Sequence, residues 1–279
     1  MKFYKILFSG LIIGAGFLLN SSSANSGLKL KSLFNGKNLD GWDTYLGPPM
    51  LDNGKHQNEV PLGLNKDPQR VFSVVKEDGM PCIRISGQAW GGLISKVSYE
   101  NFHIQLKFKW GKLQWGPKKN KKKDSGLLYY SVGDLGADYG AWMRSQEFQI
   151  EEGNCGEFWG VSGGSEDIHA QKINDSSYVY DKDAPLLQFN SESPQGRYCR
   201  KSLDNENPTG EWNTLDLYCL NGKSIHRVNE KVMMVLENSS QMNNHILSPL
   251  KEGKIQIQSE GCEIFYRDIL IEPIQKLSL

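Results

Sequence analysis

The sequence lacks an excess of charge of either sign, because 32 Lys and Arg side chains balance 32 Asp and Glu side chains. A surface that binds nucleic acid needs a basic field to neutralise phosphates, so we expect no nucleic-acid partner. One basic run, residues 118–123, interrupts this balance. Runs of like charge usually lie in exposed loops, and we expect a solvated loop there.

The chain also lacks an apolar run long enough to span a bilayer comfortably, which takes about 20 residues. The N-terminus carries Lys2 and Lys5, then the apolar residues 6–19, then a small polar segment that ends at Ala24. This order is typical of a signal peptide, residues 1–24, and an uncleaved anchor is the alternative. We expect a periplasmic or secreted chain of residues 25–279, with no stable membrane insertion after cleavage.

The five cysteines include no Cys-x-x-Cys pair, so the usual spacing of zinc and redox sites is missing. An odd number leaves at least one thiol without a partner in the chain. Most of the cysteines lie in apolar or strand-like segments, and we expect several to be small buried hydrophobic residues. Cys199 with Cys219 is the disulfide that we favour, although pairing cannot be deduced from sequence.

No long segment shows the apolar stripe of a helix, and no linker rich in Pro, Gly or Ser divides the chain. Residues 102–110 instead alternate apolar and polar side chains, as in a strand buried on one face. Asn221-Gly222 is a strong hairpin signal, and Asn229-Glu230 predicts a second hairpin. Many short strands predict an all-β sandwich, residues 25–279, formed as one domain. The further predicted strands are residues 72–75, 82–86, 126–131, 145–151, 213–220, 224–228, 231–237, 254–259 and 264–271.

Residues 153–208 carry little strand pattern and many Gly, Ser, Asp and Asn residues. Long irregular loops in compact domains are often functional. We expect an insertion that rises beside Glu151 over one face of the sandwich. It would carry Trp159, His169, Tyr178 and Tyr180.

The predicted strand at residues 145–151 holds the main candidate site. Side chains alternate faces along a strand, so Glu147, Gln149 and Glu151 point one way while Phe148 and Ile150 point the other. Neighbours in this polar triad are about 6.6 Å apart. Two carboxyl groups and an amide on one face suit a cleft for sugar chemistry or a metal ion, and a polar face in contact with water is the alternative.

Residues 142–159, which include this strand, resemble the 3-keto-disaccharide hydrolase family, together with further motifs that occur in a specific order along the chain. The resemblance spans about residues 33–273, nearly the whole chain after the predicted signal peptide. The motifs that carry it are Leu33-Phe34-Asn35-Gly36-Lys37-Asn38-Leu39-Asp40-Gly41-Trp42, Ile83-Arg84-Ile85-Ser86-Gly87, Trp90-Gly91-Gly92-Leu93-Ile94, Asp124-Ser125-Gly126-Leu127-Leu128-Tyr129, Glu211-Trp212-Asn213-Thr214 and Phe265-Tyr266-Arg267-Asp268-Ile269.

This resemblance implies a concanavalin A-like jelly roll of two antiparallel sheets. It also implies an enzyme, a glycosyl hydrolase or lyase, that acts on a carbohydrate substrate with a ketone at C3. A base would remove the C2 proton, the C1 substituent would leave, and water would add to the product. A divalent metal ion is an expected cofactor, since a cation at the C3 oxygen would stabilise the enolate.

We expect Glu147, Glu151 and His169 to be the catalytic residues, and the same three to hold the metal ion. Aromatic side chains stack on sugar rings, and Arg grips hydroxyl or carbonyl oxygens. The substrate-binding candidates are Gln149, Trp142, Arg144, Trp159 and Tyr130.

Two other functions stay open from the sequence. A conventional retaining glycosidase would use Glu147 and Glu151, whose spacing is similar to that of laminarinase-type enzymes, although the central residue there is an acid rather than Gln149. A lectin-like binding protein is the second, because Tyr130 stands where relatives often have His. His103 would face either the cleft or solvent.

Overall fold

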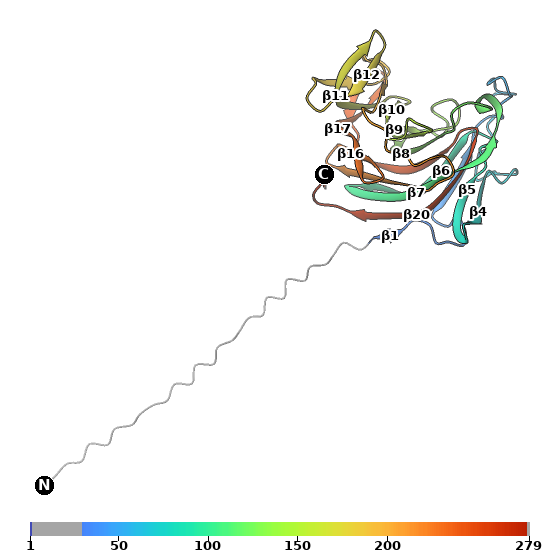
Figure 1. Ribbon diagram of the computed structural model, residues 1–279, viewed down its shortest axis with the longest axis horizontal. Helices are drawn as coiled ribbons and strands as arrows, with labels where there is room; N and C mark the ends of the chain where they lie inside the picture. The colour runs from blue at the N-terminus through green and yellow to red at the C-terminus, as the bar shows by residue number, and fades with distance from the viewer. Residues whose placement is uncertain (2–29, 278–279) are drawn as a thin grey trace.

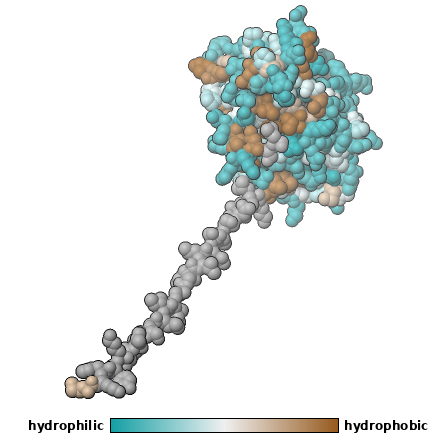
Figure 2. Space-filling view, turned by 60° about the vertical axis from the view of Figure 1, so that its left-hand side comes forward, coloured by the Kyte–Doolittle hydropathy of each residue, from teal (hydrophilic) through white to brown (hydrophobic). Residues whose placement is uncertain are grey.

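The computed structural model describes Met1 and residues 30–277, so the predicted signal peptide, residues 1–24, lies outside the described residues except for Met1. Two antiparallel sheets face each other (Figure 1), which confirms the expected all-β, concanavalin A-like jelly-roll sandwich. Among the described residues, no helix is long and apolar enough to cross a membrane. The face shown in Figure 2 is mostly polar, with small separate apolar patches.

The larger sheet has twelve strands in the order β12-β11-β17-β16-β15-β7-β20-β5-β4, and β1, β13 and β18 pair beside this path. Its strands are β1 (Lys31–Ser32), β4 (Phe72–Glu77), β5 (Met80–Ile85), β7 (Phe102–Gln114), β11 (Gly164–Asn174), β12 (Ser177–Tyr180), β13 (Leu186–Phe189), β15 (Asn213–Leu220), β16 (Lys223–Val228), β17 (Lys231–Asn243), β18 (Ile246–Pro249) and β20 (Cys262–Pro273).

The smaller sheet has eight strands in the order β14-β10-β9-β8-β19-β6-β2-β3. A single turn of 3-10 helix, η1 (Gly116–Lys118), follows β7 and leads towards β8. The strands of this sheet are β2 (Trp42–Leu46), β3 (Gly63–Leu64), β6 (Gly91–Glu100), β8 (Asp124–Val132), β9 (Arg144–Glu151), β10 (Phe158–Val161), β14 (Tyr198–Cys199) and β19 (Glu252–Ser259).

The main hydrophobic core lies between the two sheets. The alternation along β7 turns Ile104 and Leu106 inward from one sheet, and the alternation along β9 turns Phe148 and Ile150 inward from the other. All four side chains are fully buried, and each such burial stabilises the fold by about 1.5–3 kcal/mol. The same alternation sends Glu147, Gln149 and Glu151 to the outer face of the smaller sheet.

Both predicted hairpins are confirmed. Asn221 and Gly222 have φ angles of 53° and 81° between β15 and β16. Asn229 and Glu230 have φ angles of 46° and 70° between β16 and β17. Glu230 therefore occupies a left-handed position where glycine fits without steric cost.

The prediction of an irregular insertion at residues 153–208 is wrong, because this region contains β10 to β14. The hairpin of β11 and β12 rises at the upper left of the folded domain in Figure 1. Glycine hides the strand pattern here: a Cβ at Gly160 would lie 2.2 Å from the carbonyl oxygen of Gly164. Close backbone contact, rather than apolar alternation, marks these positions.

All five cysteines are buried and free, so the favoured disulfide between Cys199 and Cys219 is wrong. Cys219 belongs to the main core, whereas Cys199 packs with Phe158 and Ile168 in a smaller cluster under β11. The expectation that several cysteines act as small buried hydrophobic residues is confirmed.

Candidate active site

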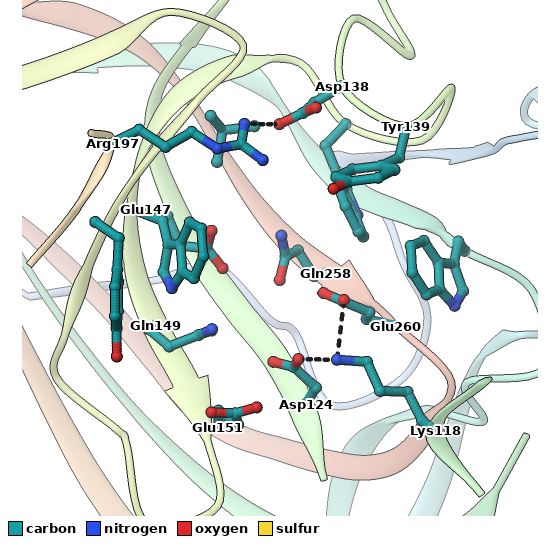
Figure 3. A pocket seen from close by; sticks show the side chains of 15 residues that line it. Lys118, Asp124, Asp138, Tyr139, Glu147, Gln149, Glu151, Arg197, Gln258 and Glu260 are labelled. Carbon is teal, nitrogen blue, oxygen red and sulfur yellow. Dashed lines mark hydrogen bonds and ion pairs between the residues drawn. The ribbon is translucent and has the colours of Figure 1, made fainter. Parts of the chain in front are cut away.

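A cavity of about 310 Å³ opens on the outer face of the smaller sheet. Strands β8 and β9 form its floor, and β10, β14 and the end of β19 border it. Figure 3 shows the acidic and amide side chains facing a shared space. The polar side chains of this floor and its edge are Asp124, Glu147, Gln149, Glu151, Gln258 and Glu260.

The register of β8 against β9 brings these groups together. Asp124 pairs with Glu151, and Gly126 pairs with Gln149. A Cβ at Gly126 would lie 2.2 Å from Oε1 of Glu147 and 2.5 Å from Oε1 of Gln258. The missing side chain at Gly126 therefore leaves the space in which the Glu147 carboxyl group lies flat against the sheet.

Glu147 is a buried acid with only 5% of its surface exposed. Burial raises its pKa well above the usual range, and the nearby Glu260 and Asp124 raise the pKa further. The positive charge of Arg197 lowers the pKa by less. The raised pKa favours the protonated form of Glu147, which suits a role as an acid.

Lys118 joins two carboxyl groups at the edge of the cavity. Its ammonium group forms ion pairs with Asp124 and, at 3.3 Å, with Oε1 of Glu260 (Figure 3). Burial opposes the lysine charge, but the two carboxyl groups outweigh it and raise the pKa of Lys118. Burial raises the pKa of Asp124 to about 6, although the charge of Lys118 and its hydrogen bond lower this pKa. Burial and the charge of Asp124 raise the pKa of Glu260 to about 8.

Glu151 and Gln149 also line the cavity from β9. The side-chain amide of Asn154 donates a hydrogen bond to Oε2 of Glu151, which is half-buried. Oε1 of Gln149 accepts a hydrogen bond from the Ile150 amide at 3.0 Å. This bond directs the amide nitrogen of Gln149 into the cavity (Figure 3).

Two pairs of stacked aromatic rings form walls of the cavity. Trp159 stacks on Tyr198 with ring centres 4.4 Å apart, and Trp90 stacks on Trp142 with ring centres 5.3 Å apart. Aromatic faces beside polar groups suit a sugar, which has apolar C–H faces and polar edges.

Arg197 provides a second cation in the cavity. It forms an ion pair with Asp138 at 2.7 Å, and its guanidinium group lies 5.6 Å from the ring centre of Trp159. In Figure 3 this pair lies on the opposite side of the cavity from Lys118.

The structure brings five of the predicted site residues to this cavity. They are Trp142, Glu147, Gln149, Glu151 and Trp159.

The other three predicted site residues lie elsewhere. Nδ1 of His169, on β11, bonds the carbonyl oxygen of Ala184 at 2.7 Å, away from the residues that line the cavity. Arg144 donates to the carbonyl oxygen of Ser162 at 2.8 Å. Tyr130 is fully buried in the core, because its φ of 53° breaks the alternation of β8.

The predicted metal ligands Glu147, Glu151 and His169 therefore do not come together. Among residues 30–277, no three His, Cys, Asp or Glu side chains are grouped so that they could hold a metal ion. The sequence left open whether His103 faces the cleft or solvent. It lies on the outer side of the larger sheet, where Asp216 at 2.8 Å and Glu272 at 3.2 Å hold its ring nitrogens.

Sequence reasoning missed Lys118, Asp124, Arg197, Gln258 and Glu260. The basic run that begins at Lys118 was expected to be solvated, and for Lys118 this is wrong, since only 18% of its side chain is exposed. Asp124 was within reach of sequence reasoning, because it stands two residues before Gly126 and therefore shares its face of β8.

The solved structures that match this chain are remote in sequence. A candidate glycosyl hydrolase from Parabacteroides distasonis is 18% identical over 88% of this chain and 94% of its own, with a TM-score of 0.49. A second one from the same organism is 19% identical over 88% of this chain and 100% of its own, with a TM-score of 0.48. The carbohydrate-binding module CBM66 from Bacillus subtilis is 7% identical over 72% of this chain and 91% of its own, with a TM-score of 0.40.

None of the curated proteins compared with this chain matches it. A family model does match, over residues 29–272, and its description is 3-keto-alpha-glucoside-1,2-lyase-like domain. The match covers almost the whole described chain and agrees with the resemblance of the sequence motifs. The chain therefore belongs to the 3-keto-α-glucoside-1,2-lyase-like domain family, and its function is carbohydrate-active.

Proposed function

We propose that this protein cleaves the glycosidic bond of 3-keto glycosides by elimination followed by hydration. The observation that carries the proposal is that a buried Glu147 and a more accessible Glu151 line one cavity walled by aromatic rings. An elimination needs an acid and a base within one substrate-sized space, and the family supplies the sugar class.

The chemistry follows from the ketone at C3. A base removes the C2 proton, and the electrons of the C2–H bond form an enolate whose charge lies on the C3 oxygen. The enolate then re-forms the ketone while the C1–O bond breaks, and the leaving alcohol takes a proton from an acid. Water next adds across the new C1–C2 double bond, with its oxygen on C1 and its proton on C2, so the net reaction is hydrolysis.

Both proton transfers of the elimination have a candidate residue in the cavity. Glu147 is the acid that gives a proton to the leaving oxygen, since burial raises its pKa and favours its protonated form. Glu151 is the base, because one of its oxygens accepts from Asn154 and the other is free to approach the C2 proton. Trp159 and Trp142 provide faces on which sugar rings stack.

A product assay on two matched substrates tests the proposal. The protein is incubated with a 3-keto glucoside and with the corresponding plain glucoside, each with and without a chelator. We expect turnover of the 3-keto glucoside alone. Turnover of the plain glucoside would support a retaining glycosidase instead, and sugar binding without turnover of either would support a lectin-like protein.

The chelator arm tests the expected metal ion separately. Loss of turnover on chelation, restored by a divalent cation, would support a metal cofactor.

Because Glu152 is next to Glu151 but does not line the cavity, Glu152→Gln is a matched control for variants of the base. We expect Glu152→Gln to keep its activity.

A further inference from the structure

We propose that the Lys118 ammonium group is the electrophile of this site and donates a hydrogen bond to the C3 oxygen of the sugar as the enolate forms. This inference rests on the proposed function, since only a 3-keto sugar develops negative charge at that oxygen. It assigns a catalytic role to a residue of the basic loop between β7 and β8.

The head of Lys118 is held in place at the cavity. Its loop is anchored by Trp115, whose indole nitrogen donates to the carbonyl oxygen of Ser86 at 2.9 Å. The ammonium group is then fixed by Asp124 and by Glu260 at 3.3 Å. A charge that is already positioned does not have to reorganise when the reaction begins, and this is what makes such a group effective in a transition state.

One donor of this ammonium group remains for a substrate. A lysine ammonium has three N–H bonds, and Asp124 and Glu260 accept two of them. Lys118 lines the cavity, so the third bond can be offered to a ligand there. In Figure 3 the nitrogen lies between the two carboxyl groups and faces the same space as Glu151.

The position of Lys118 beside the base matches the substrate. C2, which loses its proton, is bonded directly to C3, which carries the ketone, so base and electrophile must be neighbours. Asp124 is the cross-strand partner of Glu151, and it is also an ion-pair partner of Lys118. A single residue therefore links the proposed base to the proposed electrophile.

The other cation of the cavity is less suited to this role. Arg197 is engaged by Asp138 at 2.7 Å and lies against Trp159, on the far side of the space from Glu151 (Figure 3). Lys118 acts through its charge and not as a nucleophile, because its two carboxyl partners raise its pKa and keep the amine protonated.

The test compares Lys118→Met with Lys118→Arg and with Lys119→Met as a matched control. Lys119 is the adjacent lysine, half-exposed, and its partner is Asp52 at the surface. Steady-state rates are measured on a 3-keto glucoside with hydrogen or deuterium at C2, and binding is measured with the plain glucoside. Thermal unfolding reports whether each variant is folded.

We expect Lys118→Met to lower kcat by a factor of about 100 to 1,000, the usual loss for one donor to a developing oxyanion. The C2 isotope effect should grow, because proton removal becomes slower relative to other steps. Affinity for the plain glucoside should stay close to that of the natural protein. The kcat of Lys118→Arg, which keeps the charge, should lie between the kcat of Lys118→Met and that of the natural protein. Lys119→Met should behave as the natural protein does.

Two results would overturn the inference. One is a kcat of Lys118→Met within about fivefold of the natural protein. The other is an unchanged isotope effect together with a loss of plain-glucoside binding, which would mean that Lys118 only holds the cavity in shape. If Lys118→Met does not fold, an isotope effect for Lys118→Arg equal to that of the natural protein overturns it. Failure of the natural protein to act on the 3-keto glucoside would instead refute the proposed function.

Discussion

Replacing Gly126 by alanine should disable the site while leaving the fold intact. The new Cβ would lie 2.2 Å from Oε1 of Glu147 and 2.5 Å from Oε1 of Gln258. Real Cβ atoms essentially never come within 3.0 Å of a non-bonded atom outside their own and the adjacent residues, so the Glu147 oxygen must withdraw by about 1 Å. A displacement of that size costs about a hundredfold in rate, and we expect this loss in kcat on a 3-keto glucoside.

The stability of Gly126→Ala should change little. The atoms in the way are the ends of two flexible side chains, and turning each aside costs about 0.5–1.5 kcal/mol. Alanine offsets part of this cost, because glycine within a strand is less favourable by about 0.5–1 kcal/mol. We therefore expect the free energy of unfolding, measured with urea, to fall by no more than about 2.5 kcal/mol.

Gly111→Ala is the matched control for this variant. A Cβ at Gly111 would lie 2.4 Å from Oε2 of Glu263, a similar collision with a glutamate, but on the outer face of the larger sheet. We expect Gly111→Ala to lose stability to a similar, limited extent and to keep its activity. An active Gly126→Ala enzyme, or an equally inactive Gly111→Ala enzyme, would refute the argument that Gly126 makes room for the acid.

Three further predictions follow from particular residues. Glu147→Gln and Glu151→Gln should each lower turnover at least about a hundredfold with an unchanged circular dichroism spectrum, and near-native activity in both would remove the pair from the mechanism. Burial alone would lower the pKa of His103, but its two carboxylate partners outweigh burial and raise it. The resulting stability should be fully present below pH about 6.5 and lost as the pH rises through the higher folded-state pKa, and urea unfolding of His103→Gln should lack this dependence. Glu230→Gly should raise the free energy of unfolding by about 1 kcal/mol, since φ is 70° at this residue, and a lower melting temperature would contradict the reasoning.

Much of the fold could be predicted because its strands bury one face. Period-two alternation identified β7, β9 and β15, and Asn221-Gly222 identified the turn between β15 and β16. The strands of residues 153–208 were missed, since glycines such as Gly160 and Gly164 replace the expected apolar side chains where backbones meet. Alternation detects packing against a core and does not detect close contact between backbones.

The floor of the site could be predicted and its edges could not. Glu147 and Glu151 share a strand, so alternation places them on one face. Lys118, Arg197 and Glu260 reach the cavity from segments far apart in the chain, and their positions depend on tertiary structure. His169 was chosen for its chemistry, and the pairing of β11 with β13 carries it away from the cavity.

The most direct test of the proposed elimination is the isotopic content of the released sugar. A 3-keto glucoside is incubated with the protein in deuterated water, and C2 of the product is examined at early times against a control without enzyme, because free 3-keto sugars exchange slowly beside the carbonyl. Elimination and hydration predict deuterium at C2, since Glu151 removes the original proton. A product with hydrogen retained at C2 would contradict the account and would favour direct displacement at C1 with Glu147 and Glu151 as a retaining pair.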